Sequence, residues 1–129
     1  MQNEPIYLER MAGGHKITVR ALLLDEGATV LLTGGVCTHI GAVSLAEPGA
    51  PLQTLTRPGH REAVVTEPFA AGLCARLGVP AVVTGGIHYE HAGKALIKEI
   101  VDACGVLEKE TAAALCRQRE QELLNERTD

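Results

Sequence analysis

The sequence predicts one α+β domain, with a mostly antiparallel or mixed sheet and two or three helices. Apolar runs rich in β-branched residues and leucine occupy much of the first half of the chain, whereas helical periodicity dominates its last third. A length of 129 residues with 46% hydrophobic residues is enough to bury a core without disulfides. No segment has the composition of a linker, so we expect a single compact domain over residues 1–129, with its core at about 15–104.

Four segments are expected to be strands, and the first two should form a hairpin. They are residues 15–24, 28–33, 39–45 and 81–84. The hairpin follows from the turn Asp25-Glu26-Gly27 between two apolar runs, and Glu47-Pro48-Gly49 ends the third strand. We assign no element to residues 1–10 and expect a loop over residues 51–62.

The helices are expected in the second half of the chain. The first begins at Thr66-Glu67-Pro68, where a capping hydroxyl precedes a proline in the first turn, and it ends at Gly78. A second helix has apolar residues at helical spacing, namely Leu96, Ile97, Ile100, Val101 and Cys104. Gly105 is expected to end this helix as its C′ residue, and Thr111 to open a charged final helix over about 111–126.

Two glycine pairs stand at the ends of apolar runs, and each is followed by histidine. The first run ends in Thr33-Gly34-Gly35 and the second in Thr84-Gly85-Gly86. Glycine permits positive φ and close approach of backbone N–H groups to a ligand, so each pair is a candidate anion cradle, with a tight turn as the alternative. Lys94 follows the second pair at a helix start and could help to hold a phosphate. Neither pair belongs to a dinucleotide-binding or P-loop motif.

Three histidines near these glycines are candidate metal ligands: His39, His60 and His88. Three neutral imidazoles can hold a divalent cation and leave one coordination position open. Glu62 follows His60 at a spacing that places both on one side of an extended segment, where the carboxylate could bind the metal or orient a water. His91 is either a fourth ligand or part of a helix start, whereas His15 begins a strand and is expected to be structural.

Composition narrows the classes of function. A formal net charge of −4 without a basic cluster disfavours a nucleic-acid surface, and no apolar run is long enough to span a membrane. The first ten residues lack the features of a secretory signal, so we expect a cytoplasmic protein.

Cys37 lies beside His39 and is a candidate ligand or nucleophile, whereas Cys74, Cys104 and Cys116 are expected to be small apolar residues on helix faces.

Three motifs together resemble one protein family. They are residues 33–41 (TGGVCTHIG), 59–62 (GHRE) and 84–88 (TGGIH), the last followed by Lys94-Ala95-Leu96-Ile97. In order and spacing they are similar to the small D subunit of bacterial gallate-type decarboxylases, the prenylated-flavin chaperone family. The resemblance implies a fold like that of proteasome-assembly chaperone domains. It also implies binding of prenylated flavin mononucleotide and delivery of this cofactor to a partner decarboxylase. Cys37 and His91 correspond to no feature of the family.

The leading hypothesis is therefore metal-assisted binding and delivery of prenylated FMN, or of FMN itself, by an accessory protein that is not itself the decarboxylase. The predicted cofactor contacts are Gly34, Gly35, Thr38, Gly85, Gly86 and Lys94. The predicted ligands of a divalent metal ion are His39, His60 and His88. Only Tyr7, Phe69 and Tyr89 could stack on a flavin, so the ring is expected to lie mainly on aliphatic side chains and to exchange readily.

Two alternatives come from other classes of function. One is a metal-dependent hydrolase in which Glu62 or Glu90 acts as general base on a metal-bound water. The other is a cofactor-free protein-interaction module, in which the loop histidines are incidental. Exposed strand edges in so small a domain could also pair with a second copy of the chain, so a homo-oligomer is a further expectation.

Overall fold

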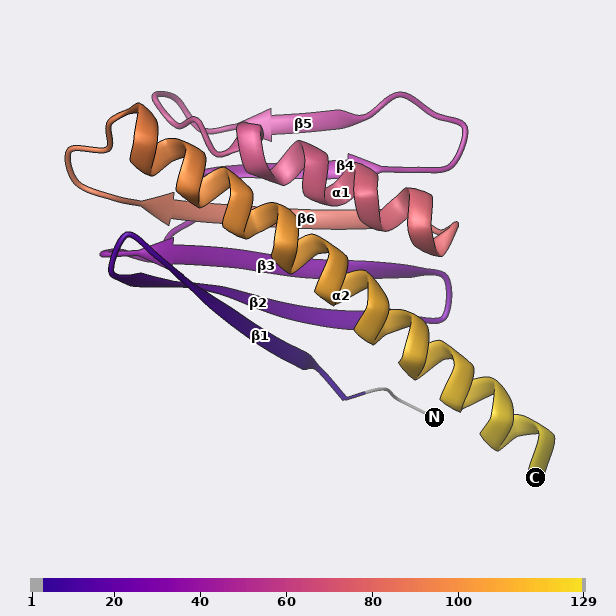
Figure 1. The fold of residues 1–129 in the computed structure, drawn as a ribbon. Helices are drawn as coiled ribbons and strands as arrows, with labels where there is room; N and C mark the ends of the chain where they lie inside the picture. Colours follow the sequence, from indigo (N-terminus) through magenta and orange to yellow (C-terminus); the bar gives the residue numbers. More distant parts are fainter. Residues whose placement is uncertain (1–3, 129) are drawn as a thin grey trace.

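In the computed structural model, which describes residues 4–128, six strands form one mixed sheet and two helices cover one of its faces (Figure 1). The strands follow the order β1-β2-β3-β6-β4-β5 across the sheet. The neighbours β3 and β6 run parallel, and the other paired strands are antiparallel. The elements are β1 (Ile6–Ala12), β2 (His15–Leu24), β3 (Gly27–Gly35), β4 (Ala42–Ala46), β5 (Gln53–Thr56), α1 (Ala63–Leu77), β6 (Ala81–His88) and α2 (Lys94–Thr128). The predicted α+β class with a mixed sheet and two helices is confirmed.

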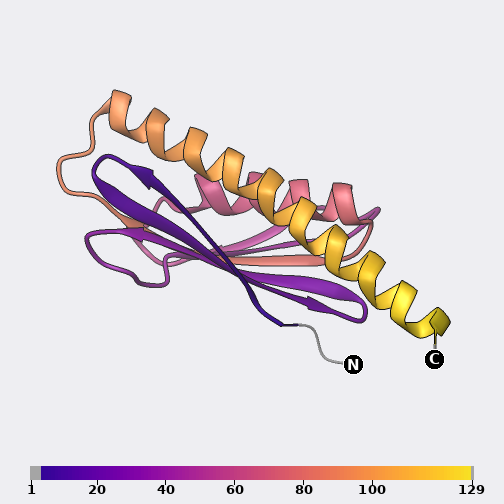
Figure 2. The same ribbon diagram turned by 60° about the horizontal axis from the view of Figure 1, so that its bottom comes forward.

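Both helices pack on the same face of the sheet. α1 lies over β4 and β6, and α2 runs diagonally across toward β1 (Figures 1 and 2). Apolar side chains of the covered face and of both helices form one core, with Phe69, Leu32 and Leu107 among its fully buried members. Within residues 4–128, no helix combines the length and the apolar character that crossing a membrane requires.

The predicted hairpin is confirmed, and its first strand has the predicted bounds. In β2, buried Ile17, Val19 and Ala21 alternate with more exposed residues, which is the pattern of a strand with one covered face. β3 and β6 are longer than expected, because their parallel pairing continues through both glycine pairs to Gly35 and His88. The glycine pairs therefore lie within the sheet rather than after it.

Two edge strands were not predicted, and one predicted strand begins too early. β1 pairs with β2 through a turn at Gly13 and Gly14, which have φ values of +55° and +78°. β5 lies in the expected loop and has only four residues, largely exposed. The strand expected at 39–45 begins at Ala42, because the residues up to Gly41 form a loop that crosses the end of β6.

α1 begins three residues earlier than predicted. Glu62 is its N-cap residue, and Thr66, the expected cap, is fully buried inside the helix. The Thr66 hydroxyl lies 2.9 Å from the Ser44 hydroxyl on β4, so it bonds to the sheet instead of to the helix end. Gly78 ends the helix in the left-handed conformation, as expected.

The two helices expected after residue 93 are one continuous helix, α2. Its buried stripe runs without interruption past the expected break, through Ile100, Ala103, Cys104, Leu107, Ala112 and Leu115. Thr111 is buried in mid-helix and its hydroxyl donates to the Leu107 carbonyl at 2.6 Å, so it caps no new helix. Gly105 lies on an exposed part of the helix and does not end it.

Candidate functional site

The candidate site lies at the end of the sheet where β3 and β6 finish side by side. The parallel register places Gly35 opposite His88. The loop after β3 carries His39, and the turn before α1 carries His60 and Glu62. Two backbone bonds of 2.8 Å and 2.7 Å hold these segments together, from Arg57 N to the Gly41 carbonyl and from Gly41 N to the Gly85 carbonyl.

Glycines allow the loops to pack this closely. A Cβ on Gly86 would overlap the backbone carbonyl of His39, and a Cβ on Gly41 would overlap the Glu62 carboxylate. Gly35 has a φ of +83°, and a Cβ there would overlap the His88 carbonyl. These glycines therefore fix where His39, Glu62 and His88 lie. A role of the glycine pairs in binding an anion stays a prediction.

His39, His60 and Glu62 form a compact group of donor atoms. One ligand atom from each lies within 4.8 Å of the other two. His39 Nε2 is 2.5 Å from Glu62 Oε2, and the centroids of the His39 and His60 rings are 5.2 Å apart. Imidazole nitrogens and a carboxylate oxygen are the donors that zinc and similar divalent ions accept.

Both imidazoles are oriented by backbone carbonyls. His39 Nδ1 lies 3.3 Å from the Cys37 carbonyl, and His60 Nδ1 lies 3.0 Å from the Pro58 carbonyl. A carbonyl can only accept, so a proton on each Nδ1 would satisfy these carbonyls and leave Nε2 of each neutral ring with a lone pair for a metal ion. This is the arrangement in which metal-binding histidines are usually held.

Glu62 provides the strongest indication of a cation. Its side chain is 8% exposed, and its Oε2 atom has no hydrogen-bond partner among the described residues although His39 Nε2 is so close. Its other oxygen, Oε1, accepts from the Arg61 backbone N–H at 3.1 Å. A buried carboxylate oxygen this close to an imidazole nitrogen needs a proton or a metal ion between the two atoms. A proton on His39 Nε2 or a bound divalent ion would each fill that role.

The other predicted site residues lie outside the group formed by His39, His60 and Glu62. His88 is exposed, and its ring lies edge-on to that of His39 at a centroid distance of 6.4 Å, outside the compact donor group. Thr38 and Lys94 are exposed, and Lys94 is the first residue of α2. His91 is exposed in a left-handed turn with φ of +52°. His15 is the first residue of β2 and its ring lies edge-on to that of Tyr89, and its structural role stays a prediction.

A pocket of about 510 Å³ adjoins the donor group. Glu62, His88 and Arg61 line its polar end, and most of its wall is apolar, formed by residues of α1, α2 and the end of β6: Val64, Val65, Ile87, Ile97, Ile100 and Val101. The volume is that of a small-molecule site, and the few polar groups lie together at one side.

Tyr89 also lines this pocket and acts as a neutral donor. Burial, and to a lesser extent the nearby Cys104 and Glu99, raises the pKa of Tyr89. Its hydroxyl therefore keeps its proton and donates to the Ala12 carbonyl at 2.6 Å. This bond ties the segment after β6 to the turn between β1 and β2.

The residues that surround the predicted ligands leave few signals in the sequence. Arg61 also lines the pocket, and its place beside His60 is the one signal of this in the sequence. Ile97 and Val101 were expected in the apolar stripe of a helix, but they are more than a third exposed and face the pocket. Periodicity identifies such a stripe without showing which of its residues border a hollow.

Comparisons with known proteins are consistent with this fold. Residues 11–116 match the family described as the prenylated flavin chaperone LpdD-like domain. No curated protein is similar enough in sequence to count as a match. Among solved structures, a chain of a chaperone complex for yeast 20S proteasome assembly is 15% identical, covers 85% of this chain and 98% of its own, and has a TM-score of 0.54. At that identity the likeness concerns the fold alone, and it agrees with the predicted assembly-chaperone-like architecture.

Proposed function

Because the chain belongs to the prenylated flavin chaperone LpdD-like family, we propose that it holds prenylated FMN in the pocket beside His39, His60 and Glu62. We further propose that it delivers this cofactor to a partner decarboxylase. The observation that carries the site assignment is a shared wall: Glu62 belongs to the donor group and also lines the pocket. A ligand in the pocket would thus lie directly against the donor atoms.

The residues that line the pocket support this proposal, because cationic groups suit the flavin phosphate and aliphatic side chains suit the flavin ring. The flavin phosphate is a dianion, and Arg61, Lys94 and the glycine-rich strand ends are the groups we assign to it. The aliphatic wall suits a planar ring, and Tyr89 adds an aromatic face to it. Contacts that are mostly aliphatic suit a carrier, because the ligand must leave again.

We assign a divalent metal ion to His39, His60 and Glu62, with His88 as the additional predicted ligand at the pocket side. The buried Oε2 of Glu62 and the two oriented imidazoles fit such an ion. A metal at this position would supply positive charge beside the anionic cofactor, so that chelation or acid would weaken cofactor binding.

The test is titration of the purified protein with reduced prenylated FMN under anaerobic conditions, followed by absorbance. We expect His39→Ala and His88→Ala each to weaken binding by about tenfold or more. His91→Asn is the matched control, because His91 is exposed outside the donor group and asparagine tolerates its positive φ. Wild-type affinity in both alanine variants, or an equal loss in His91→Asn, would contradict the site assignment.

Delivery requires a second measurement. Loaded protein is mixed with the apo form of a prenylated-flavin-dependent decarboxylase, and decarboxylation is compared with that produced by the same amount of free cofactor. We expect faster activation by the loaded protein. If activation proceeds only at the rate given by free cofactor, the protein binds the cofactor but does not deliver it.

We also assign the protein to the cytoplasm, which its four unpaired cysteines support.

We propose in addition that two copies of the chain associate through the sheet face that carries no helix. On this face Leu31, Thr84, Val43 and Leu55 lie in one register row, and Leu31 and Leu55 are exposed large apolar side chains. We expect sedimentation equilibrium to give a dimer and Leu31→Lys to shift it toward monomer. A wild-type monomer at high protein concentration would refute this.

A further inference from the structure

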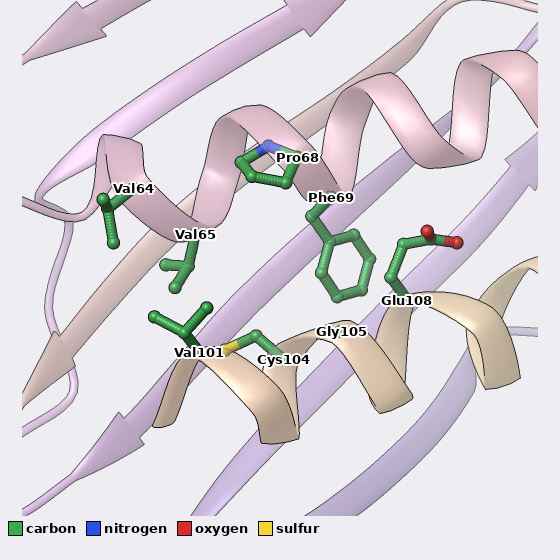
Figure 3. A pocket seen from close by; sticks show the side chains of 8 residues that line it. All are labelled: Val64, Val65, Pro68, Phe69, Val101, Cys104, Gly105 and Glu108. Atoms are coloured by element: carbon green, nitrogen blue, oxygen red, sulfur yellow. The ribbon is translucent and has the colours of Figure 1, made fainter. Parts of the chain in front are cut away.

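A second hollow lies between the two helices, next to the pocket described above. It has a volume of about 130 Å³ and lies between α1 and α2 (Figure 3). Pro68 and Phe69 of α1 face Cys104 and Gly105 of α2 across it. We call this hollow the interhelical groove.

The groove adjoins the candidate cofactor pocket. The two hollows share three lining residues, Val64 and Val65 of α1 and Val101 of α2. Glu62 and His88 line the pocket and not the groove, so a ligand beside these polar groups would border the groove at the three valines.

The groove is apolar along its length. Burial raises the pKa of the Cys104 thiol to about 12, so the thiol is neutral at physiological pH and acts as a small apolar side chain. Glu108 at the far end is paired with Arg76, whose Nε lies 3.0 Å from its carboxylate. Water gains few hydrogen bonds in such a space, whereas a hydrocarbon fits it.

Gly105 lines the groove and contributes no side chain to it. It lies in mid-helix, where glycine is less favourable than alanine, and it does not end the helix. No atom lies within 4 Å of where its Cβ would be, so close packing does not require glycine there. Gly72 on α1 differs, because a Cβ on it would overlap the Glu108 carboxylate. The missing side chain at position 105 leaves space for another molecule.

We propose that the interhelical groove is the subsite for the prenyl-derived hydrocarbon of the cofactor, and that it distinguishes prenylated from unmodified flavin. This inference rests on the proposed function. An apolar cavity of about 150 Å³ accommodates benzene, so the groove is of the right size for a branched group of about five carbons. The ring system then occupies the larger pocket, with its phosphate toward Arg61.

The experiment places larger side chains at position 105 to fill the groove, and it measures the selectivity for prenylated over unmodified flavin. Dissociation constants for reduced prenylated FMN and reduced FMN are determined for the wild type, Gly105→Leu, Gly105→Met and Gly105→Ala. Each buried methylene contributes about fourfold in affinity, so we expect the wild type to prefer the prenylated cofactor by about tenfold or more. In the leucine and methionine variants this preference should fall to about twofold, with FMN affinity unchanged.

Gly105→Ala is the graded variant, because it adds helix propensity and one methyl group without reaching across the groove. Its preference should lie between those of the wild type and of the two larger variants, and circular dichroism should show all three variants folded. If wild-type protein binds neither flavin, the proposed function fails. If the wild type prefers the prenylated cofactor and both larger variants keep that preference, or if they lose both ligands equally, the groove is not the prenyl subsite.

Discussion

Replacing Glu62 with glutamine is expected to lower the affinity for a divalent metal ion by about a hundredfold or more, while the fold persists. The Glu62 carboxylate is buried and completes the donor group with His39 and His60. Loss of a group that only orients a ligand typically costs ten- to a hundredfold in metal affinity, so loss of a direct anionic donor should cost at least the upper value. Glutamine has nearly the same shape, removes the negative charge and replaces one acceptor oxygen with an NH2 group.

Isothermal titration with Zn²⁺ at neutral pH measures this change, and thermal unfolding with and without Zn²⁺ gives a second readout. A metal that binds the folded state alone raises the melting temperature, so the wild type should shift and Glu62→Gln should not. Glu67→Gln is the control, since Glu67 lies on the same helix and accepts from Thr54 at 2.6 Å outside the donor group. Wild-type protein that binds no Zn²⁺ would mean that a proton on His39, as part of an ion pair, supplies the positive charge instead.

The fold could be predicted where burial leaves a periodic trace in the sequence. The alternation in β2 and the glycine-ended turn to β3 gave the central hairpin, because one face of each strand is buried. The edge strands β1 and β5 are largely exposed, so their sequences carry no such alternation. Gly105 and Thr111 carry the usual signals of helix ends, and the continuous buried stripe of α2 overrides them.

The candidate site could be predicted less completely, because it depends on contacts between distant segments. The motifs and the family resemblance identified His39, His60 and His88 as candidates. They could not show that Gly41 brings the Glu62 carboxylate against His39, or that His88 lies farther away. The walls of the pocket come from α1, β6 and α2, and only the packing of the two helices against each other determines their spacing.

Gly86→Ala is expected to destabilise the protein by about 3 kcal/mol, which would lower the melting temperature by on the order of 10 °C. A methyl group on Gly86 would overlap the His39 backbone carbonyl, and a backbone cannot move aside as a flexible side chain can. Relieving the overlap requires the His39 loop to lift from β6. Metal and cofactor binding should then fall together with stability.

Thermal unfolding and Zn²⁺ titration of Gly86→Ala, with Gly93→Ala as control, test this expectation. A Cβ on Gly93 would meet nothing within 4 Å, so the same added methyl group should cost only about 1 kcal/mol, from the N-cap preference for glycine over alanine, and should leave binding unchanged. The result also separates two roles for the glycine pairs. If Gly86 served only to expose its N–H group to an anion, alanine would preserve stability and weaken ligand binding alone. A stable Gly86→Ala protein would thus refute close packing as the reason for glycine at this position, and would favour the anion cradle.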